Sequence, residues 1–145
     1  MTSSEIPAPR DHWFRAVGYG LLAEVFTVVT IIAIVMAYRY LFARGQPDAD
    51  YAAFGMQTGE TVGMVGGTIF TFLWARRLMH RLEGKFVAHG VVVAIAAIAF
   101  SVAGSIVGHQ GVPTRYIIAS ALKLGAGALA GLLYSRTISG NRNEV

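Results

Sequence analysis

The segment AVGYGLLAEVFTVVTIIAIVMAY, residues Ala16 to Tyr38, decides the fold class of this chain. It is longer than the ~20 predominantly apolar residues that a helix needs to cross a bilayer. It also exceeds the ~7–15-residue apolar core of a signal peptide, and no small-x-small cleavage site separates it from Arg39 and Arg44. The segment therefore predicts a first transmembrane helix that stays in the mature protein.

Three further apolar runs follow the first one. Each is close to or above the length that crosses a bilayer, and they span residues 54–75, 86–107 and 114–135. The connections between the runs contain Gly and Pro breakers or basic residues, and all are too short for an extramembrane domain. We therefore expect an all-α membrane protein with four transmembrane helices in one bundle. This single domain covers residues 13–136, between a polar disordered tail at 1–12 and a polar tail at 137–145.

The composition agrees with a membrane protein and excludes several other classes. Of the 145 residues, 54% are hydrophobic and 14% are charged, where a soluble domain carries about 25% charged residues. The net charge of +4 comes from basic residues that flank the apolar runs, so it does not indicate a nucleic-acid partner. Cysteine is absent, which excludes disulfides and thiolate metal sites. No motif of hydrolases, zinc proteases or nucleotide-binding enzymes occurs, so we expect neither an enzyme nor a cofactor.

The four histidines are not arranged as metal or haem ligands. No two of them are separated by one helical turn, and they lie near or outside the ends of the apolar runs, at His12, His80, His89 and His109. We expect them to be solvated at the membrane interface, and we expect no metal.

Lys and Arg are distributed unequally between the two sides of the expected bundle. With four spans, one side has Arg10, Arg15, Arg76, Arg77, Arg81, Lys85, Arg136 and Arg142, and the other has Arg39, Arg44 and Arg115. The positive-inside rule then places both termini in the cytoplasm, in a bacterial-type inner membrane. Orientation alone accounts for the basic stretch from Arg76 to Lys85. The alternative is that this stretch also binds anionic lipid headgroups or a protein partner.

Three ionisable side chains, Glu24, Glu60 and Lys123, lie inside the expected spans. A charge at the bilayer centre costs about 2.5–3.5 kcal/mol on insertion scales, so such residues usually face the bundle interior or pair with one another. A rise of ~1.5 Å per residue places Lys123 ~5 Å in depth from Glu60 and ~7 Å from Glu24. We therefore predict that Lys123 pairs with Glu60. Glu24 is then the unpaired acid, either uncharged or exposed to water.

Small and hydroxylated side chains share the helix face of each charge, as on surfaces that face protein or water. The candidates for lining such a surface are Gln57, Thr71, Tyr116 and Ser120. The pattern suits a structural ion pair that only fixes helix register, and it also suits a working site for a proton or cation. Two functions therefore stay open. One is a proton- or cation-linked transporter or channel, and the other is a non-catalytic accessory subunit of a larger membrane complex.

Glycines recur in the second and fourth runs at a spacing of four residues. They are Gly55, Gly59, Gly63 and Gly67, and then Gly127 and Gly131. This spacing lets a second backbone approach closely. It predicts either tight packing within one bundle or a seam between copies of the chain. We therefore expect self-association or association with another membrane subunit.

The stretch GYGLLAEVFTVV, from Gly18 to Val29, resembles the first helix of small multidrug resistance transporters. Those are four-helix proteins with an essential Glu in a similar local setting, and Glu24 is the one position that carries over. The likeness ends with this stretch, because the second helix of that family has no membrane Glu among glycines and its fourth has no Lys. The resemblance implies only that a four-helix protein can use one Glu for proton-coupled exchange as a dimer.

Overall fold

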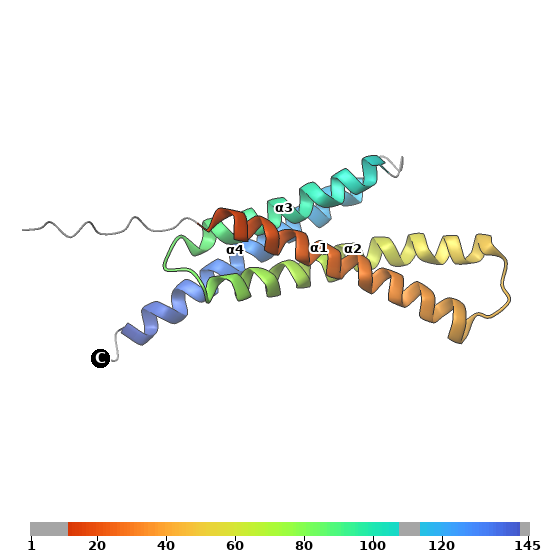
Figure 1. Ribbon diagram of the computed structural model, residues 1–145, viewed down its shortest axis with the longest axis horizontal. Helices are drawn as coiled ribbons and strands as arrows, with labels where there is room; N and C mark the ends of the chain where they lie inside the picture. Colours follow the sequence, from red (N-terminus) through yellow and green to blue (C-terminus); the bar gives the residue numbers. More distant parts are fainter. Residues whose placement is uncertain (1–11, 108–113, 143–145) are drawn as a thin grey trace, which may run out of the picture.

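The computed structural model describes residues 12–107 and 114–142, which form four long helices (Figure 1). These are α1 (Trp13–Ala37), α2 (Asp48–Met79), α3 (Phe86–Val107) and α4 (Thr114–Arg142), and a π-helical turn, η1 (Tyr38–Phe42), extends α1. Three of the helices are long and apolar enough to cross a membrane: α1 together with η1, α3, and α4 as far as Ser139. The chain is thus an all-helical bundle with the architecture of a membrane protein.

Large apolar side chains cover the outside of the bundle, while small residues fill much of its interior. Phe14, Phe42 and Ile117 are among the exposed apolar residues. The buried residues include Ala23, Ala97 and several other alanines. Helices that associate in lipid use small residues at their contacts and leave large apolar ones to face the acyl chains. The surface and the core both fit that environment.

The helix α2 differs from the other three because it is not among the helices that are apolar enough to cross a membrane. Glycines, threonines, Gln57 and Glu60 take up much of the segment that was expected to be a span. Its length of 32 residues is nonetheless enough for a crossing, since ~20 residues span the apolar core of a bilayer. That α2 crosses the membrane therefore remains a prediction. Its length is sufficient for a crossing, but its composition is not apolar enough to support one.

The helices extend beyond the apolar runs that predicted them. α2 already begins at Asp48, directly after Pro47, and Asp48 and Asp50 in its first turn suit the positive end of the helix dipole. The polar tail expected from residue 137 is helical as far as Arg142. Most of the expected N-terminal tail (1–11), the connection 108–113 with His109, and residues 143–145 lie outside the described residues.

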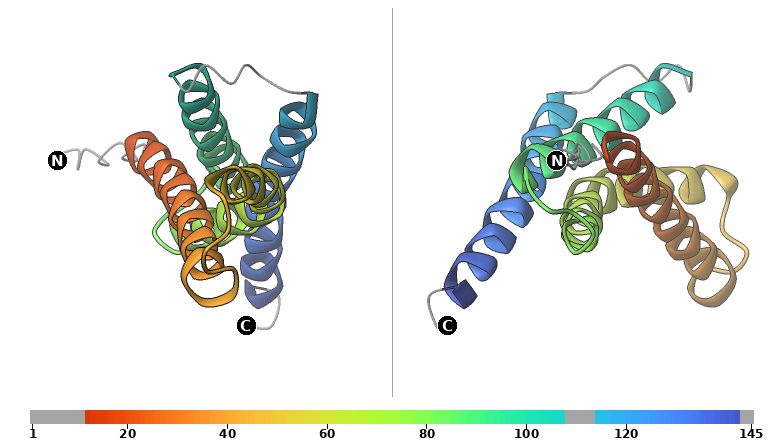
Figure 2. Two further views of the ribbon diagram at one scale, coloured as in Figure 1. Left: turned by 90° about the vertical axis from the view of Figure 1, so that its right-hand side faces the viewer. Right: turned by 60° about the vertical axis from the view of Figure 1, so that its left-hand side comes forward.

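Each helix packs along two main neighbours, so that α1 and α4 lie diagonally opposite each other. α1 packs against α2 and α3, and α4 packs against the same two helices. We call the end where α1 begins, α2 meets α3 and α4 finishes the closed end. At the opposite end, the open end, the α1–α2 hairpin turns away from α3 and α4 (Figures 1 and 2). The bundle is therefore gathered at one end and splayed at the other.

Apolar residues seal the bundle toward the closed end. Leu78 and Met79 of α2 and Val93 of α3 are fully buried there, in a cluster with Ala16, Ala75 and Ala130. α3 and α4 cross in direct backbone contact, because a Cβ atom on Gly90 would lie 2.1 Å from the Gly127 carbonyl oxygen. Such contact is possible only where both residues lack a side chain.

The glycine repeat of α2 has a smaller part in this packing than its spacing suggested. Gly67 is buried against α4, but no atom outside its local surroundings lies within 4 Å of a Cβ built on Gly59 or Gly63, and Gly55 approaches only Val35, at 3.9 Å. The glycines that press against the backbone of another helix lie instead on α1, α3 and α4, at Gly20, Gly90, Gly127 and Gly131. Gly55, Gly59 and Gly63 thus make no close contact with another helix of the bundle.

Candidate functional site

Lys123 of α4 and Glu24 of α1 form an ion pair in the middle of the bundle. Lys123 Nζ donates to Glu24 Oε2 at 2.7 Å. The two residues are only 4% and 7% exposed, so the pair is shielded from the surroundings of the bundle. Because α1 and α4 are diagonal to each other, the lysine side chain reaches across the centre to make this contact.

Ser101 of α3 connects both members of the pair. Its hydroxyl donates to Glu24 Oε1 at 2.5 Å and accepts a hydrogen bond from Lys123 Nζ at 2.9 Å. The Ala97 carbonyl oxygen, at 3.1 Å, is a second acceptor within reach of the same hydroxyl. We call Glu24, Ser101 and Lys123 the central triad. It draws one side chain from each of three helices.

The remaining helix, α2, places a glycine beside the triad and so leaves room for the lysine side chain. A Cβ atom on Gly67 of α2 would lie 2.8 Å from Lys123 Cε and 3.3 Å from Nζ, so the lysine occupies the volume that a larger residue would need. The Thr27 hydroxyl of α1 lies 3.7 Å from the same point and donates to the Ala23 carbonyl at 2.9 Å. Beside the Glu24 carboxylate, the ammonium group therefore has small residues and a hydroxyl oxygen around it.

The predicted pairing of Lys123 with Glu60 is wrong, and Glu24 is not the unpaired acid. The two depths differed by only ~2 Å on the helical rise, which the length of a lysine stem easily absorbs. The lateral arrangement decides the partner instead. Lys123 points between α1, α2 and α3 toward Glu24, whereas Glu60 lies where α2 meets the start of α4.

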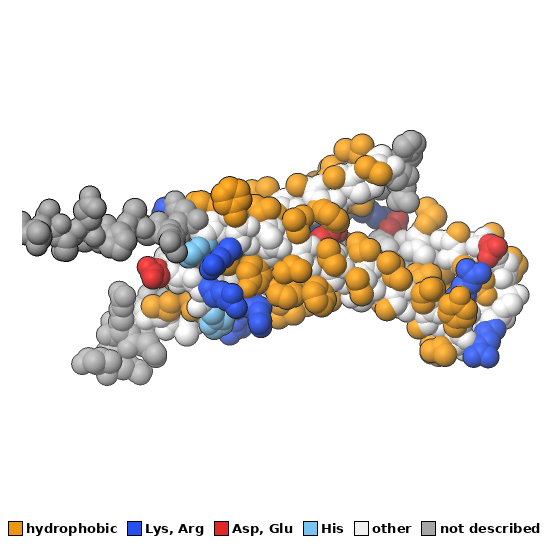
Figure 3. Space-filling view, viewed as in Figure 1, with side chains coloured by type: hydrophobic (Ala, Val, Ile, Leu, Met, Phe, Trp, Pro, Cys, Tyr) orange, Lys and Arg blue, Asp and Glu red, His pale blue; other side chains and the backbone are white. Residues whose placement is uncertain are grey.

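Glu60 pairs with Arg115, the second residue of α4. Both side chains are accessible, with 49% and 72% of their surfaces exposed. Figure 3 shows acidic and basic side chains in the recess between α3 and the α1–α2 hairpin. Gly67 and Lys123 follow Glu60 and Arg115 by about two helical turns, so the exposed pair lies ~11 Å nearer the open end than the central triad. Sequence reasoning missed Arg115 because it treated that residue only as a flanking charge.

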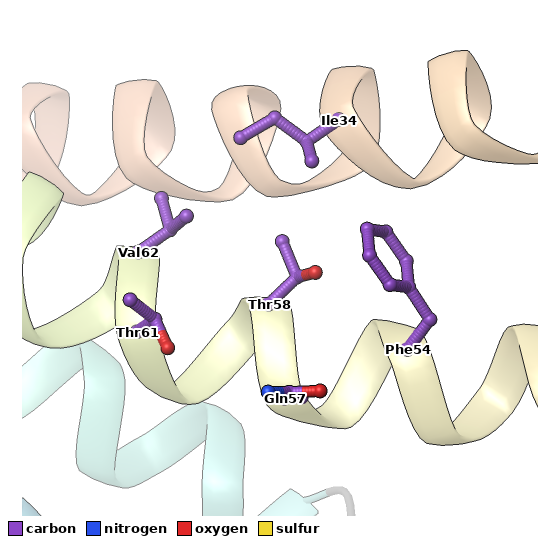
Figure 4. A pocket seen from close by; sticks show the side chains of 6 residues that line it. All are labelled: Ile34, Phe54, Gln57, Thr58, Thr61 and Val62. Carbon is purple, nitrogen blue, oxygen red and sulfur yellow. The ribbon is translucent and has the colours of Figure 1, made fainter. Parts of the chain in front are cut away.

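The four lining candidates do not come together in one cavity. Gln57 borders a shallow hollow of about 270 Å³ between α1 and α2, together with Thr58 and Thr61. Figure 4 shows Phe54, Thr58 and Val62 pointing from α2 toward α1, with Ile34 facing them. Tyr116 and Ser120 border a second hollow of about 380 Å³ between α3 and α4. Thr71 is buried and donates to the Gly67 carbonyl oxygen at 2.7 Å, so it supports the helix beside Lys123.

His89 is not solvated at the interface, as the sequence had suggested. It is 3% exposed, its Nδ1 donates to the Lys85 carbonyl at 2.9 Å, and its ring stacks on Trp13 with 4.2 Å between ring centres. His80 is exposed and lies edge-to-face with Tyr134. Over residues 12–107 and 114–142, no group of three or more His, Asp or Glu side chains is placed to hold a metal ion.

Basic side chains gather at the closed end, beside the apolar surface of the bundle. Arg76, Arg77 and Arg81 are exposed there, and Figure 3 shows the cluster next to hydrophobic side chains. Charged side chains therefore lie in this exposed cluster, in the two ion pairs of the bundle, and at the α1–α2 hairpin, where Arg39 pairs with Asp48. No protein-family model matches the chain, and no curated protein or solved structure is significantly similar to it.

Proposed function

We propose that the protein is a small inner-membrane transporter or channel, linked to protons or cations, that acts as an oligomer. The observation that carries this proposal is that the buried Glu24–Lys123 pair has a second, accessible ion pair about two helical turns away. The second pair, Glu60 with Arg115, lies nearer the open end. A pair that only fixed helix register would need no accessible pair of charges nearby.

The proposed topology has four spans, with both termini in the cytoplasm. The exposed arginines of the α2–α3 connection support it, because they would place the closed end on the cytoplasmic side. The open end would then face outward. In that orientation the apolar cluster around Leu78, Met79 and Val93 separates the central triad from the cytoplasm, as an inner barrier would.

Separation of Glu24 from Lys123 would allow α4 to change its position relative to α1. Glu24 and Lys123 neutralise each other, so a proton or cation that arrives at Glu24 weakens the attraction that holds Lys123. α1 and α4 are not neighbours along their lengths, which makes this pair a principal link across that diagonal. A proton or cation at Glu24 would thereby favour a second arrangement of α4 relative to α1.

An oligomer is proposed because one face of α2 remains uncovered in the protomer. Gly59 and Gly63 are open, and the neighbouring Gln57 is polar for a surface in contact with lipid. A second copy packed against this face would cover these groups. Gly63→Leu should then lower the oligomer size on size-exclusion chromatography while the helical content stays unchanged. An unchanged oligomer would show that α2 is not the contact.

Anionic lipid headgroups are the proposed partners of the basic residues at the closed end, namely Arg76, Arg77, Arg81 and Lys85. Cations beside an apolar surface are typical of a segment at the cytoplasmic leaflet, which carries negative lipids. Phosphatidylglycerol in nanodiscs should raise the melting temperature more than phosphatidylcholine does, and an Arg76→Gln/Arg77→Gln variant should lose the difference. An equal response of both proteins would exclude these arginines as the lipid contact.

Flux in proteoliposomes tests the transport proposal directly. Wild-type vesicles that contain a pH-sensitive dye should show proton or monovalent cation movement under an imposed gradient, and Glu24→Gln should abolish it. Glu83→Gln is the matched control, because Glu83 is an exposed acid in the α2–α3 connection, away from the triad. If wild-type vesicles move neither protons nor cations, the transport proposal fails.

The alternative is an accessory subunit of a larger membrane complex. The mutual neutralisation of Glu24 and Lys123 inside a close-packed bundle favours it, since a purely structural pair has that form. An accessory subunit should show no flux by itself, and Glu24→Gln should then affect only folding and assembly.

A further inference from the structure

We infer that the central triad is a binding site for a small monovalent cation, and that the ammonium group of Lys123 fills the place of that cation in this structure. The inference rests on the proposed function and names the class of ion at the same site. Its test measures binding and not flux, so the two can fail separately.

The polar atoms on the central side of the bundle present lone pairs to the ammonium group. Glu24 contributes a carboxylate whose Oε2 is 2.7 Å from Lys123 Nζ, and Ser101 contributes a hydroxyl oxygen at 2.9 Å. The acceptors of the Ser101 hydroxyl are Glu24 Oε1 and the Ala97 carbonyl oxygen, so its own oxygen accepts from Nζ. A set of carboxylate and hydroxyl oxygens suits a hard cation.

The hydroxyl of Thr27 is a further oxygen that can act only as an acceptor toward other groups. This hydroxyl lies 3.7 Å from the Cβ position of Gly67, which Lys123 Nζ approaches at 3.3 Å, and its hydrogen goes to the Ala23 carbonyl. A hydroxyl that donates its one hydrogen to its own helix offers only lone pairs to other groups. An anion at this position would need hydrogen-bond donors from Ser101 and Thr27, and both of these hydrogens are already used. The chemistry of the shell therefore favours a cation.

The charge of the site sets the valence of the ion. Among the described residues that surround Lys123 Nζ, Glu24 supplies the one carboxylate, which balances a single positive charge. A divalent ion would leave an uncompensated charge in a poorly solvated interior, which is strongly unfavourable. A monovalent ion such as sodium or lithium carries the same charge as the lysine it would replace.

Lys123 and a free cation then compete for the same oxygens. The lysine reaches them on a four-carbon stem from α4, whereas Glu24, Ser101 and Thr27 belong to α1 and α3. Lys123→Met retains an unbranched apolar side chain of similar length beside Gly67 and removes the tethered charge. This variant should turn an occupied site into a vacant one that a free ion can enter.

The experiment compares the purified full-length Lys123→Met protein in sodium, lithium and choline chloride at matched ionic strength. Sodium or lithium should raise its melting temperature by about 5 °C or more in a saturable manner relative to choline, which is too large to enter. The double variant Lys123→Met/Glu24→Gln lacks the carboxylate and should melt at the same temperature in all three salts. Glu24→Gln alone should not distinguish chloride from gluconate, whereas a chloride-specific rise would indicate an anion site and overturn the inference.

Poor folding of the single variant does not prevent the test. Lys123→Met purified in sodium should aggregate after dialysis into choline, and the double variant should remain monodisperse in both salts. The inference is overturned if Lys123→Met melts at one temperature in every salt, or if sodium fails to yield soluble protein while the double variant folds. A sodium-specific rise without any flux in wild-type vesicles would retain the cation site and reject transport.

Discussion

Lys123 and Glu24 meet across the diagonal of the bundle, between two helices that are not neighbours along their lengths. The contact holds α4 toward α1 in a bundle whose α1–α2 hairpin turns away from α3 and α4 at the open end (Figure 1). A charge pair in this position has two consequences. It links the two halves of the bundle, and it leaves a buried unpaired charge if either member is removed.

Removal of one member should be costly, and removal of both should restore much of the loss. In choline chloride, Lys123→Met should lower the free energy of unfolding by about 3–5 kcal/mol, because Glu24 is left buried without a partner. Adding Glu24→Gln should recover most of that loss, and the coupling is obtained from a double-mutant cycle in detergent. Adding Glu60→Gln instead should recover nothing. Equal recovery by both second substitutions would contradict the pairing.

The exposed pair should contribute far less to stability than the buried one. Glu60 and Arg115 are largely accessible, so solvent screens their attraction, and Glu60→Gln or Arg115→Gln should each change the unfolding free energy by less than ~1 kcal/mol. Thermal melts of both variants at low and high salt measure this effect. A loss as large as that of Lys123→Met would mean that Glu60 and Arg115 are covered in the assembled protein.

The crossing of α3 and α4 should tolerate no side chain at its centre. Gly90→Ala and Gly127→Ala each place a Cβ atom within 2.2 Å of the opposing carbonyl oxygen, so the helices must separate, at a cost of about 1–3 kcal/mol or more. Gly104→Ala on α3 and Gly125→Ala on α4 are matched controls, because their Cβ atoms meet nothing within 4 Å. Melting temperatures of the four variants should fall into two groups, and a control that melts as low as its partner would contradict this packing.

The crossing of the membrane by α2 can be tested by labelling, because the chain has no cysteine of its own. A single cysteine at Asp48 should react with an impermeant maleimide added to intact cells. A single cysteine at Glu83 should react only after the membrane is permeabilised. Both positions are exposed in the protomer, so accessibility depends on the membrane side. Labelling of both from the same side would show that α2 does not cross.

Apolar composition alone determined that the chain forms long helices in a bundle, and three of these helices meet the requirements for crossing a membrane. Each apolar run lies within one of the observed helices, with Tyr38 in η1, because burial in lipid requires both an apolar surface and a backbone satisfied within each helix. The ends were less accurate. Pro47 with Asp48 and Asp50 marks the start of α2, a signal the apolar runs did not include.

Tertiary structure alone decided the partners of the charges and the positions of the close contacts. Depth along a helix follows from the sequence, but which helix lies across the bundle does not, and the stem of Lys123 can reach several acids at similar depth. Likewise, the sequence around a glycine does not show whether that residue is free of close contacts, as Gly63 is, or lies against a carbonyl oxygen of another helix, as Gly90 does. The sequence therefore determined the helices and which residues carry charge, while the packing of four helices determined that Lys123 meets Glu24 and that Arg115 meets Glu60.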